Sequence, residues 1–189
     1  RPDRGVTDSR PILTVDMDGV FCEPFFGKNL GIHRMFLDTD APPPEADIPP
    51  KRLGPVLDHL RFDLRRPLPE ARDALIRLGT VRRLVVLTGR RSQPRWWFRR
   101  HGFQGLFERV IINEGAYKSP HFKLEAVLAL GSAEHVDDDP RTVQLLAERS
   151  TTRVFLRDWP RNRDLPYHPR VERVRDLADL ADRLGAPPR

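Results

Sequence analysis

Short, mostly apolar runs alternate with amphipathic stretches along most of the chain. The runs have the length of β-strands and lie at residues 12–15, 84–87, 110–112, 134–136 and 153–156. The amphipathic stretches predict helices at residues 69–78, 93–101, 122–130, 141–148 and 174–184. Strands that alternate with helices indicate a parallel sheet covered by helices on both faces. The pattern therefore predicts an α/β fold, a Rossmann-like three-layer sandwich.

One stretch interrupts this alternation. Residues 21–67 contain several glycines and prolines, including the run Pro42–Pro44, and show no regular period. Long inserts of this kind are uncommon in compact domains and are usually functional. We therefore expect a single domain over residues 1–189, with a small cap at 21–67 inserted after the first strand.

The composition is that of a water-soluble globular chain. Hydrophobic residues make up 39% of the sequence and charged residues 32%, which is enough for a core and typical of folded domains. No apolar run approaches the roughly 20 residues that a membrane-spanning helix needs. The first ten residues have no apolar stretch of the signal-peptide type, and the single cysteine, Cys22, excludes an internal disulfide. These features predict a cytoplasmic protein with no membrane partner.

The net charge of +6 leaves a nucleic-acid partner open without favouring it. Basic proteins often bind nucleic acids or anionic substrates. The bases here are 29 arginines and only four lysines, and the arginines are scattered along the chain. The segment "PRWWFRR", residues 94–100, could stack on bases, although core packing plus an exposed helix face is the preferred interpretation.

Residues whose side chains or amides could bind a ligand or catalyse a reaction follow the predicted strands directly. In parallel α/β sheets, ligands bind beyond the carboxyl ends of the strands, so these residues should share one edge. They are Asp16, Asp18 and Gly19 after the first strand, Thr88, Gly89 and Arg90 after the second, and Asp137, Asp138 and Asp139 after the fourth.

Carboxylates from two strand ends favour a magnesium site. Asp16 and Asp18 repel each other, and a hard divalent cation held by them and by Asp137 through oxygen atoms offsets that repulsion. Beside such a cation Asp16 can attack a phosphorus atom, while Asp18 can protonate the leaving oxygen and later activate water. Asp139 fits a helix cap before Pro140 better than a ligand.

Phosphoryl oxygens need partners of their own. Gly19 would let the chain turn sharply and expose its amides to a phosphate, and the Thr88 hydroxyl and the Gly89 amide can hold phosphoryl oxygens. A lysine would complete the positive charge around the transition state. Lys123 is favoured over Lys118 because it opens a predicted helix close to the fourth strand and so has a rigid mount.

The segments "VDMDGVF", "VVLTGR", a lysine at a helix start and "HVDDDP" resemble the four motifs of the haloacid dehalogenase (HAD) superfamily, in that order. The resemblance covers residues 12 to 140. It implies Asp16 as nucleophile and Asp18 as acid/base with its backbone carbonyl on Mg²⁺. It also implies Thr88 as a phosphate ligand and Asp137 as a further metal ligand supported by Asp138. An aspartate at position 18 resembles the phosphatase and phosphomutase branches.

A closer likeness exists to the 5'-(deoxy)ribonucleotidase branch. It is carried by "VDMDGVF", "RPLPEARDAL", "HVDDDP" and "LRDWPRNR" and by the position of the cap. The sequence thus predicts a magnesium-dependent phosphomonoester hydrolase that acts on a small organic phosphate, with Gly19, Gly89 and Arg90 in contact with the substrate. A nucleic-acid end phosphatase, a phosphomutase and a non-catalytic HAD-like binding module remain the alternatives.

Overall fold

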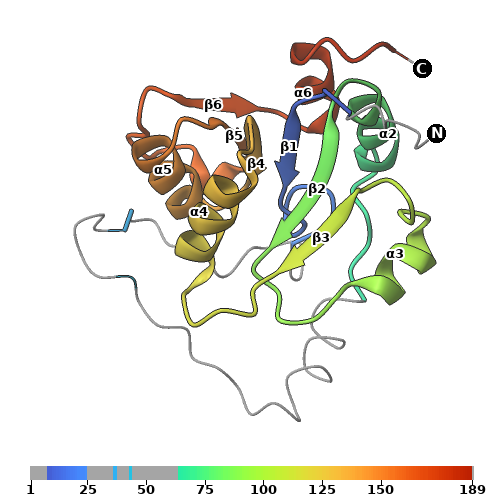
Figure 1. Ribbon diagram of the computed structural model, residues 1–189. Helices are drawn as coiled ribbons and strands as arrows, with labels where there is room; N and C mark the ends of the chain where they lie inside the picture. The colour runs from blue at the N-terminus through green and yellow to red at the C-terminus, as the bar shows by residue number, and fades with distance from the viewer. Residues whose placement is uncertain (1–7, 25–35, 38–42, 44–63, 189) are drawn as a thin grey trace, which may run out of the picture.

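A computed structural model describes residues 8–24, 36–37, 43 and 64–188 of the chain. Its centre is a six-stranded sheet in which every neighbouring pair is parallel (Figure 1). The strand order is β3-β2-β1-β4-β5-β6. The strands are β1 (Ile12–Val15), β2 (Arg83–Thr88), β3 (Arg109–Ile112), β4 (Glu134–Asp137), β5 (Arg153–Arg157) and β6 (Val171–Val174). The strand order makes β1 and β4, which are far apart in the sequence, direct neighbours.

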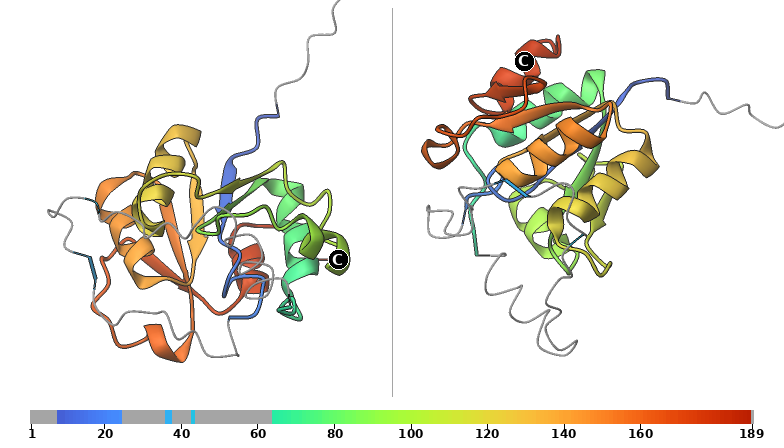
Figure 2. Two further views of the ribbon diagram at one scale, coloured as in Figure 1. Left: turned by 90° about the horizontal axis from the view of Figure 1, so that it is seen from below. Right: turned by 90° about the vertical axis from the view of Figure 1, so that its left-hand side faces the viewer.

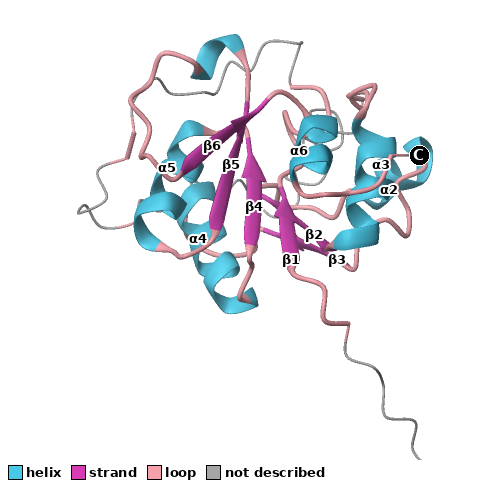
Figure 3. Ribbon diagram, turned by 90° about the horizontal axis from the view of Figure 1, so that it is seen from above, coloured by secondary structure: helices cyan, strands magenta, loops and turns pink. Residues whose placement is uncertain are grey.

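Helices cover both faces of the sheet. Figure 3 shows α4 and α5 on one side of the strands and α2, α3 and α6 on the other, and Figure 2 gives two further views of these layers. The helices are α2 (Ala71–Val81), α3 (Arg95–His101), α4 (Ser119–Leu130), α5 (Pro140–Arg149) and α6 (Leu177–Arg183). The predicted three-layer α/β sandwich with a Rossmann-like parallel sheet is therefore confirmed.

The sheet separates two hydrophobic cores, one on each face, because successive side chains of a strand point to opposite faces. In β2, Val86 packs into the core beneath α2, α3 and α6, whereas Leu87 packs into the core beneath α4 and α5. In β5, Phe155 belongs to the first core and its two neighbours to the second. Strands buried on both faces read as continuous apolar runs, and that is the pattern from which the sequence predicted them.

Helix ends follow local chemistry. The Asp139 side chain accepts a hydrogen bond from the Arg141 amide and caps α5, with Pro140 in the first turn, as the sequence predicted. Gly131 ends α4 with a φ of 59°, a left-handed conformation that glycine adopts without steric cost. These caps fix where α4 and α5 begin and end relative to β4.

The C-terminal region differs from the prediction. The sequence predicted one helix over residues 174–184, but Val174 ends the edge strand β6, and α6 begins three residues later. The sequence "VERV" escaped the search for apolar runs because only Val174 of this edge strand is fully buried. Its glutamate, Glu172, instead pairs with Arg153 of β5 at 2.6 Å across the two strands.

The predicted cap, residues 21–67, lies largely outside the described residues, but its two ends are described. The Leu68 amide donates to the Phe21 carbonyl at 3.0 Å, and the Glu23 amide donates to the Arg66 carbonyl at 2.8 Å. The two ends of the insert therefore lie side by side. Within the part of the chain that the structure describes, no helix has the length and apolar character required to cross a bilayer.

Aromatic packing next to this junction generates a stability prediction. Trp97 is fully buried, with its ring 4.9 Å from Phe103 and 5.9 Å from Phe21, whereas the side chain of its neighbour Trp96 is 40% exposed. We expect Trp97→Ala to lower the free energy of unfolding by about 3–5 kcal/mol, since a large cavity remains. Trp96→Ala should lower it by about 1 kcal/mol or less. Urea unfolding of both variants checks this, and equal losses would contradict the assigned packing.

Candidate active site

Three buried carboxylates meet where the two central strands end. Asp16 follows β1, Asp137 is the last residue of β4, and Asp138 follows it. One oxygen of each lies within 4.8 Å of the others. The Asp16 amide donates to the Val136 carbonyl at 3.0 Å, which extends the pairing of β1 and β4 into the site. The expected meeting of acidic groups at one sheet edge thus occurs.

A lysine from α4 joins two of these carboxylates. The Lys123 Nζ atom lies 2.8 Å from Asp16 Oδ1 and 2.6 Å from Asp137 Oδ2, and its side chain is only 3% exposed. Lys118, the other lysine considered, is exposed and stands at the position before α4. The structure therefore brings Lys123, and not Lys118, into the acidic cluster.

The charges of the cluster do not balance. Burial, together with the negative charges of Asp137, Asp18 and Asp138, raises the pKa of Asp16 well above its usual value, and Lys123 offsets this only in part. Burial also disfavours ionised Asp137, but Lys123 and His135 hold its pKa below the ordinary range. Burial opposes the charge of Lys123, yet Asp137 and Asp16 raise the pKa of its ammonium. One ammonium thus serves two carboxylates directly.

The Asp138 carboxylate packs directly against the backbone of Gly19. A Cβ atom placed on Gly19 would lie 2.0 Å from Asp138 Oδ2, so the carboxylate occupies the space that any other side chain would fill. The Arg161 Nη2 atom donates to the same oxygen at 2.8 Å, and the Asn162 side-chain Nδ2 atom donates to the Asp138 backbone carbonyl at 3.3 Å. The Trp159 indole donates to the Gly19 carbonyl at 2.9 Å. The loop after β5 therefore holds both acidic strand ends.

Burial and the neighbouring Asp137 carboxylate raise the pKa of Asp138 to about 7, with Arg161 acting in the opposite direction. A buried carboxyl whose pKa lies this far above normal is short of positive charge. Together with the raised pKa of Asp16, this makes the cluster a fit for a cation. An all-oxygen set of carboxylates suits a hard divalent ion such as Mg²⁺.

Asp18 has different surroundings from the other acidic residues. Arg90 binds its carboxylate with two donors, Nη2 at 2.6 Å and Nε at 3.0 Å, and Arg65 adds a third contact at 2.8 Å. Burial disfavours its charge, but the two arginines keep the pKa of Asp18 below the usual value. The Asp18 side chain is not part of the group of three carboxylates. The part predicted for its backbone carbonyl on a cation stays a prediction.

The residues after β2 form the adjoining wall. Thr88 ends the strand, is 1% exposed, and its hydroxyl accepts a hydrogen bond from the Arg90 amide at 3.4 Å. A Cβ atom on Gly89 would lie 2.6 Å from Ser119 Oγ, so glycine lets this loop approach the start of α4 closely. The sequence predicted that Arg90 contacts the substrate, and in the structure its guanidinium binds the Asp18 carboxylate. Its contact with a substrate remains a prediction.

Sequence reasoning missed three residues that contact the predicted acids: Arg65, His135 and Arg161. His135 had a usable signal, because it stands two positions before Asp137 in a strand and therefore shares a face with it. Arg65 lies at the end of an irregular insert, and Arg161 lies in a loop after another strand. No local pattern ties either arginine to its partner.

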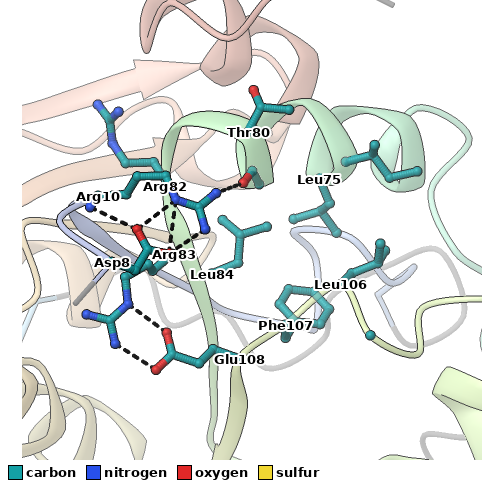
Figure 4. A pocket seen from close by; sticks show the side chains of 13 residues that line it. Asp8, Arg10, Leu75, Thr80, Arg82, Arg83, Leu84, Leu106, Phe107 and Glu108 are labelled. Atoms are coloured by element: carbon teal, nitrogen blue, oxygen red, sulfur yellow. Dashed lines mark hydrogen bonds and ion pairs between the residues drawn. The ribbon is translucent and has the colours of Figure 1, made fainter. Parts of the chain in front are cut away.

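A separate cavity of about 710 Å³ lies at the other end of the sheet, where β1, β2 and β3 begin (Figure 4). It has an apolar wall that includes Leu75, Leu84 and Phe107. Its charged groups pair with one another or with neighbours, among them Arg83 with Glu108 at 2.7 Å. None of the acids, the threonine or the lysine of the predicted chemistry lines it, so the acidic cluster is the better candidate for catalysis.

Comparison with known proteins identifies the fold. No protein-family model matches the chain, and no curated protein matches it. Solved structures do match. A haloacid dehalogenase-like family hydrolase from Xanthomonas campestris is 14% identical, with 94% of this chain and 96% of that one covered and a TM-score of 0.58. A candidate phosphoglycolate phosphatase from Lactobacillus plantarum is 16% identical, with coverage of 92% and 98% and a TM-score of 0.59.

A third match is the L-2-haloacid dehalogenase from Xanthobacter autotrophicus with chloropropionic acid covalently bound. It is 14% identical, covers 74% of this chain and 69% of that one, and has a TM-score of 0.57. The chain therefore has the α/β fold found in haloacid dehalogenase-like hydrolases. Because one fold hosts many reactions, the likeness establishes the architecture, and the reaction has to be argued from the site.

The packing of Asp138 on Gly19 generates a second prediction. Gly19 and Gly105 have nearly the same φ, 80° and 75°, but nothing lies within 4 Å of a Cβ atom on Gly105. Gly105→Ala should therefore cost only the backbone strain, about 1–2 kcal/mol. Gly19→Ala should cost about 1–3 kcal/mol more, because Asp138 has to move. Urea unfolding measures both losses, and identical values would show that the close contact carries no energy.

Proposed function

We propose that the chain is a magnesium-dependent phosphomonoester hydrolase that works through an aspartyl phosphate on Asp16. The observation that carries the proposal is the meeting of Asp16, Asp137 and Asp138 around a shared space, with the Lys123 ammonium on two of them. The occurrence of this cluster at the carboxyl end of the central strands, in a fold found among hydrolases, supports it.

In the first step an Asp16 oxygen attacks the phosphorus atom, a carboxyl O–P bond forms, and the ester P–O bond breaks. The leaving oxygen takes a proton from Asp18. In the second step water attacks the same phosphorus, Asp18 takes the proton of that water, and the Asp16 carboxylate is released together with inorganic phosphate. Asp16, Asp137 and Asp138, together with the Asp18 carbonyl, would hold Mg²⁺, which when bound would compensate the charge of the phosphoryl oxygens.

Arg90 and Arg65 bear on both steps. They hold Asp18 as a carboxylate, which is the form that accepts the proton of water in the second step. Protonation of the leaving oxygen requires these ion pairs to loosen when substrate is bound, so that Asp18 takes up a proton from solvent before the first step. The Thr88 hydroxyl and the amides of Gly89 and Gly19 would hold phosphoryl oxygens, and Lys123 would keep Asp16 aligned for attack.

The substrate class that we propose is a small organic phosphate, with nucleoside 5'-monophosphates as the first candidates. The likeness of "LRDWPRNR" and the other segments to the 5'-(deoxy)ribonucleotidase branch supports this choice. It gains support from Trp159 and Arg161 of that segment, which contact Gly19 and Asp138 at the site. A phosphoglycolate phosphatase among the structural matches is consistent with a small phosphorylated substrate.

The direct test is phosphate release from a mononucleotide and from p-nitrophenyl phosphate, with Mg²⁺ and after its removal by EDTA. We expect release that requires Mg²⁺ and returns when Mg²⁺ is restored. Parallel reactions with an oligonucleotide 5'- or 3'-phosphate, and with a 2-chloro acid, cover the end phosphatase and the dehalogenase reaction. Turnover of the chloro acid alone would contradict the proposed reaction and indicate a dehalogenase. Transfer of phosphate to a second hydroxyl without free phosphate would contradict it and indicate a phosphomutase.

Substitution of the nucleophile gives a third prediction. Asp16→Asn should lower kcat by on the order of 10⁴-fold or more, because the amide cannot form the covalent intermediate. Asp139→Asn is the matched control, since Asp139 caps α5 and asparagine caps helices equally well. That variant should keep near-normal phosphate release. Full activity of Asp16→Asn would eliminate the mechanism.

A further inference from the structure

His135 is buried beneath the acidic cluster and has no part in the mechanism above. It lies in β4, directly opposite Thr14 of the neighbouring strand β1. Its Nε2 atom lies 3.1 Å from Asp137 Oδ2, and its Nδ1 atom lies 2.8 Å from the Thr14 hydroxyl. The imidazole is fully buried. Two positions apart in one strand, His135 and Asp137 share a face, so the ring reaches the carboxylate from below.

Among the residues that the structure describes, the hydrogen bonds around Asp137 leave one acceptor position open. Its Oδ2 atom receives Lys123 Nζ at 2.6 Å and His135 Nε2 at 3.1 Å, and its Oδ1 atom receives the Asp139 amide at 2.9 Å. A carboxylate has about four acceptor sites, two on each oxygen. The remaining site is on Oδ1. The carboxylate is thus fixed in rotation, with Oδ1 as the oxygen that has an open acceptor site for a cation.

The network also fixes the tautomer of the ring. An ionised carboxylate only accepts hydrogen bonds, so the proton must be on Nε2 of His135. Nδ1 then accepts, and its donor is the Thr14 hydroxyl. The Thr14 hydroxyl also lies 3.1 Å from the Glu134 carbonyl, but the Ser132 hydroxyl is closer to that carbonyl, at 2.8 Å, and with Ser132 donating there the Thr14 hydrogen goes to the ring at 2.8 Å. Every polar atom of the chain Thr14–His135–Asp137 is satisfied with a neutral imidazole.

We propose that His135 is a positioning residue for the metal site: Thr14 orients its ring, and the ring's Nε2–H fixes the Asp137 carboxylate so that Oδ1 keeps an open site for the cation. This inference rests on the proposed function, because it assigns a role toward the cation held by that cluster. Outer partners that orient a liganding group commonly change metal affinity by about 10- to 100-fold when they are removed. An apolar residue would fill this part of the core without any need for two buried hydrogen bonds.

The experiment compares two variants of nearly equal shape. Glutamine at position 135 keeps an N–H donor close to the Nε2 position, whereas methionine has similar length and no donor. We expect His135→Met to weaken Mg²⁺ binding, measured by titration calorimetry, by about 10- to 100-fold, and His135→Gln to stay within a few-fold of the original chain. Thr14→Val should weaken binding less, and its effect should vanish in the His135→Met background, since the two residues act in series.

Each outcome of this experiment either supports or overturns the role proposed for His135. Equal weakening in the methionine and glutamine variants, or none in either, would overturn the inference, provided that circular dichroism shows both variants folded. A ¹⁵N NMR spectrum of the metal-free chain gives a readout that needs no metal, and we expect the proton on Nε2. A proton on Nδ1 alone would also overturn it. Failure of the original chain to bind Mg²⁺ would instead contradict the proposed function, and this inference with it.

Discussion

The ion pairs of Lys123 are the contact on which the rest of the site depends. Burying Asp16 and Asp137 side by side is strongly unfavourable unless a positive group lies between them, since both charges lose hydration and repel each other. The Lys123 ammonium touches both carboxylates. It reaches them from α4, so the charge that makes the cluster tolerable also ties a helix to the two central strands. Removal of that ammonium would leave two uncompensated buried charges.

The strand order makes this arrangement available. β1 ends at Val15 and β4 begins only at Glu134, yet they pair directly, and their carboxyl ends face the same edge. The loop after β5 then closes over that edge. Trp159 and Arg161 bind the Gly19 carbonyl and Asp138, so a third segment fixes the relative position of the two acidic strand ends. Such fixed, water-poor surroundings favour electrostatic catalysis because the dipoles need no reorganisation.

The architecture alone does not select the reaction. Structures of similar fold include a dehalogenase with chloropropionic acid covalently bound and a candidate phosphoglycolate phosphatase. Our proposal for this chain rests instead on its own second carboxylate, Asp18, held by two arginines, together with a cluster of acids suited to a cation. A halide leaves without protonation, whereas an alkoxide leaving group needs an acid, and we propose phosphoester chemistry because Asp18 could supply that acid beside Asp16.

The sequence by itself determined the order of most strands and helices, the three-layer architecture and the residues at each strand end. These features are local: they depend on the period of apolar residues and on which residue follows a strand. It did not reveal the edge strand β6, whose face is mostly polar, and it could only favour Lys123 over Lys118. Tertiary structure alone decided that Lys123 contacts the acids, that Arg65 and Arg90 hold Asp18, and that His135 supports Asp137. The contacts of Lys123, Arg65 and Arg90 join segments distant in the sequence, which no periodic pattern records. The alternation of β4 indicates that His135 and Asp137 share a face, but only the structure shows the 3.1 Å hydrogen bond between them.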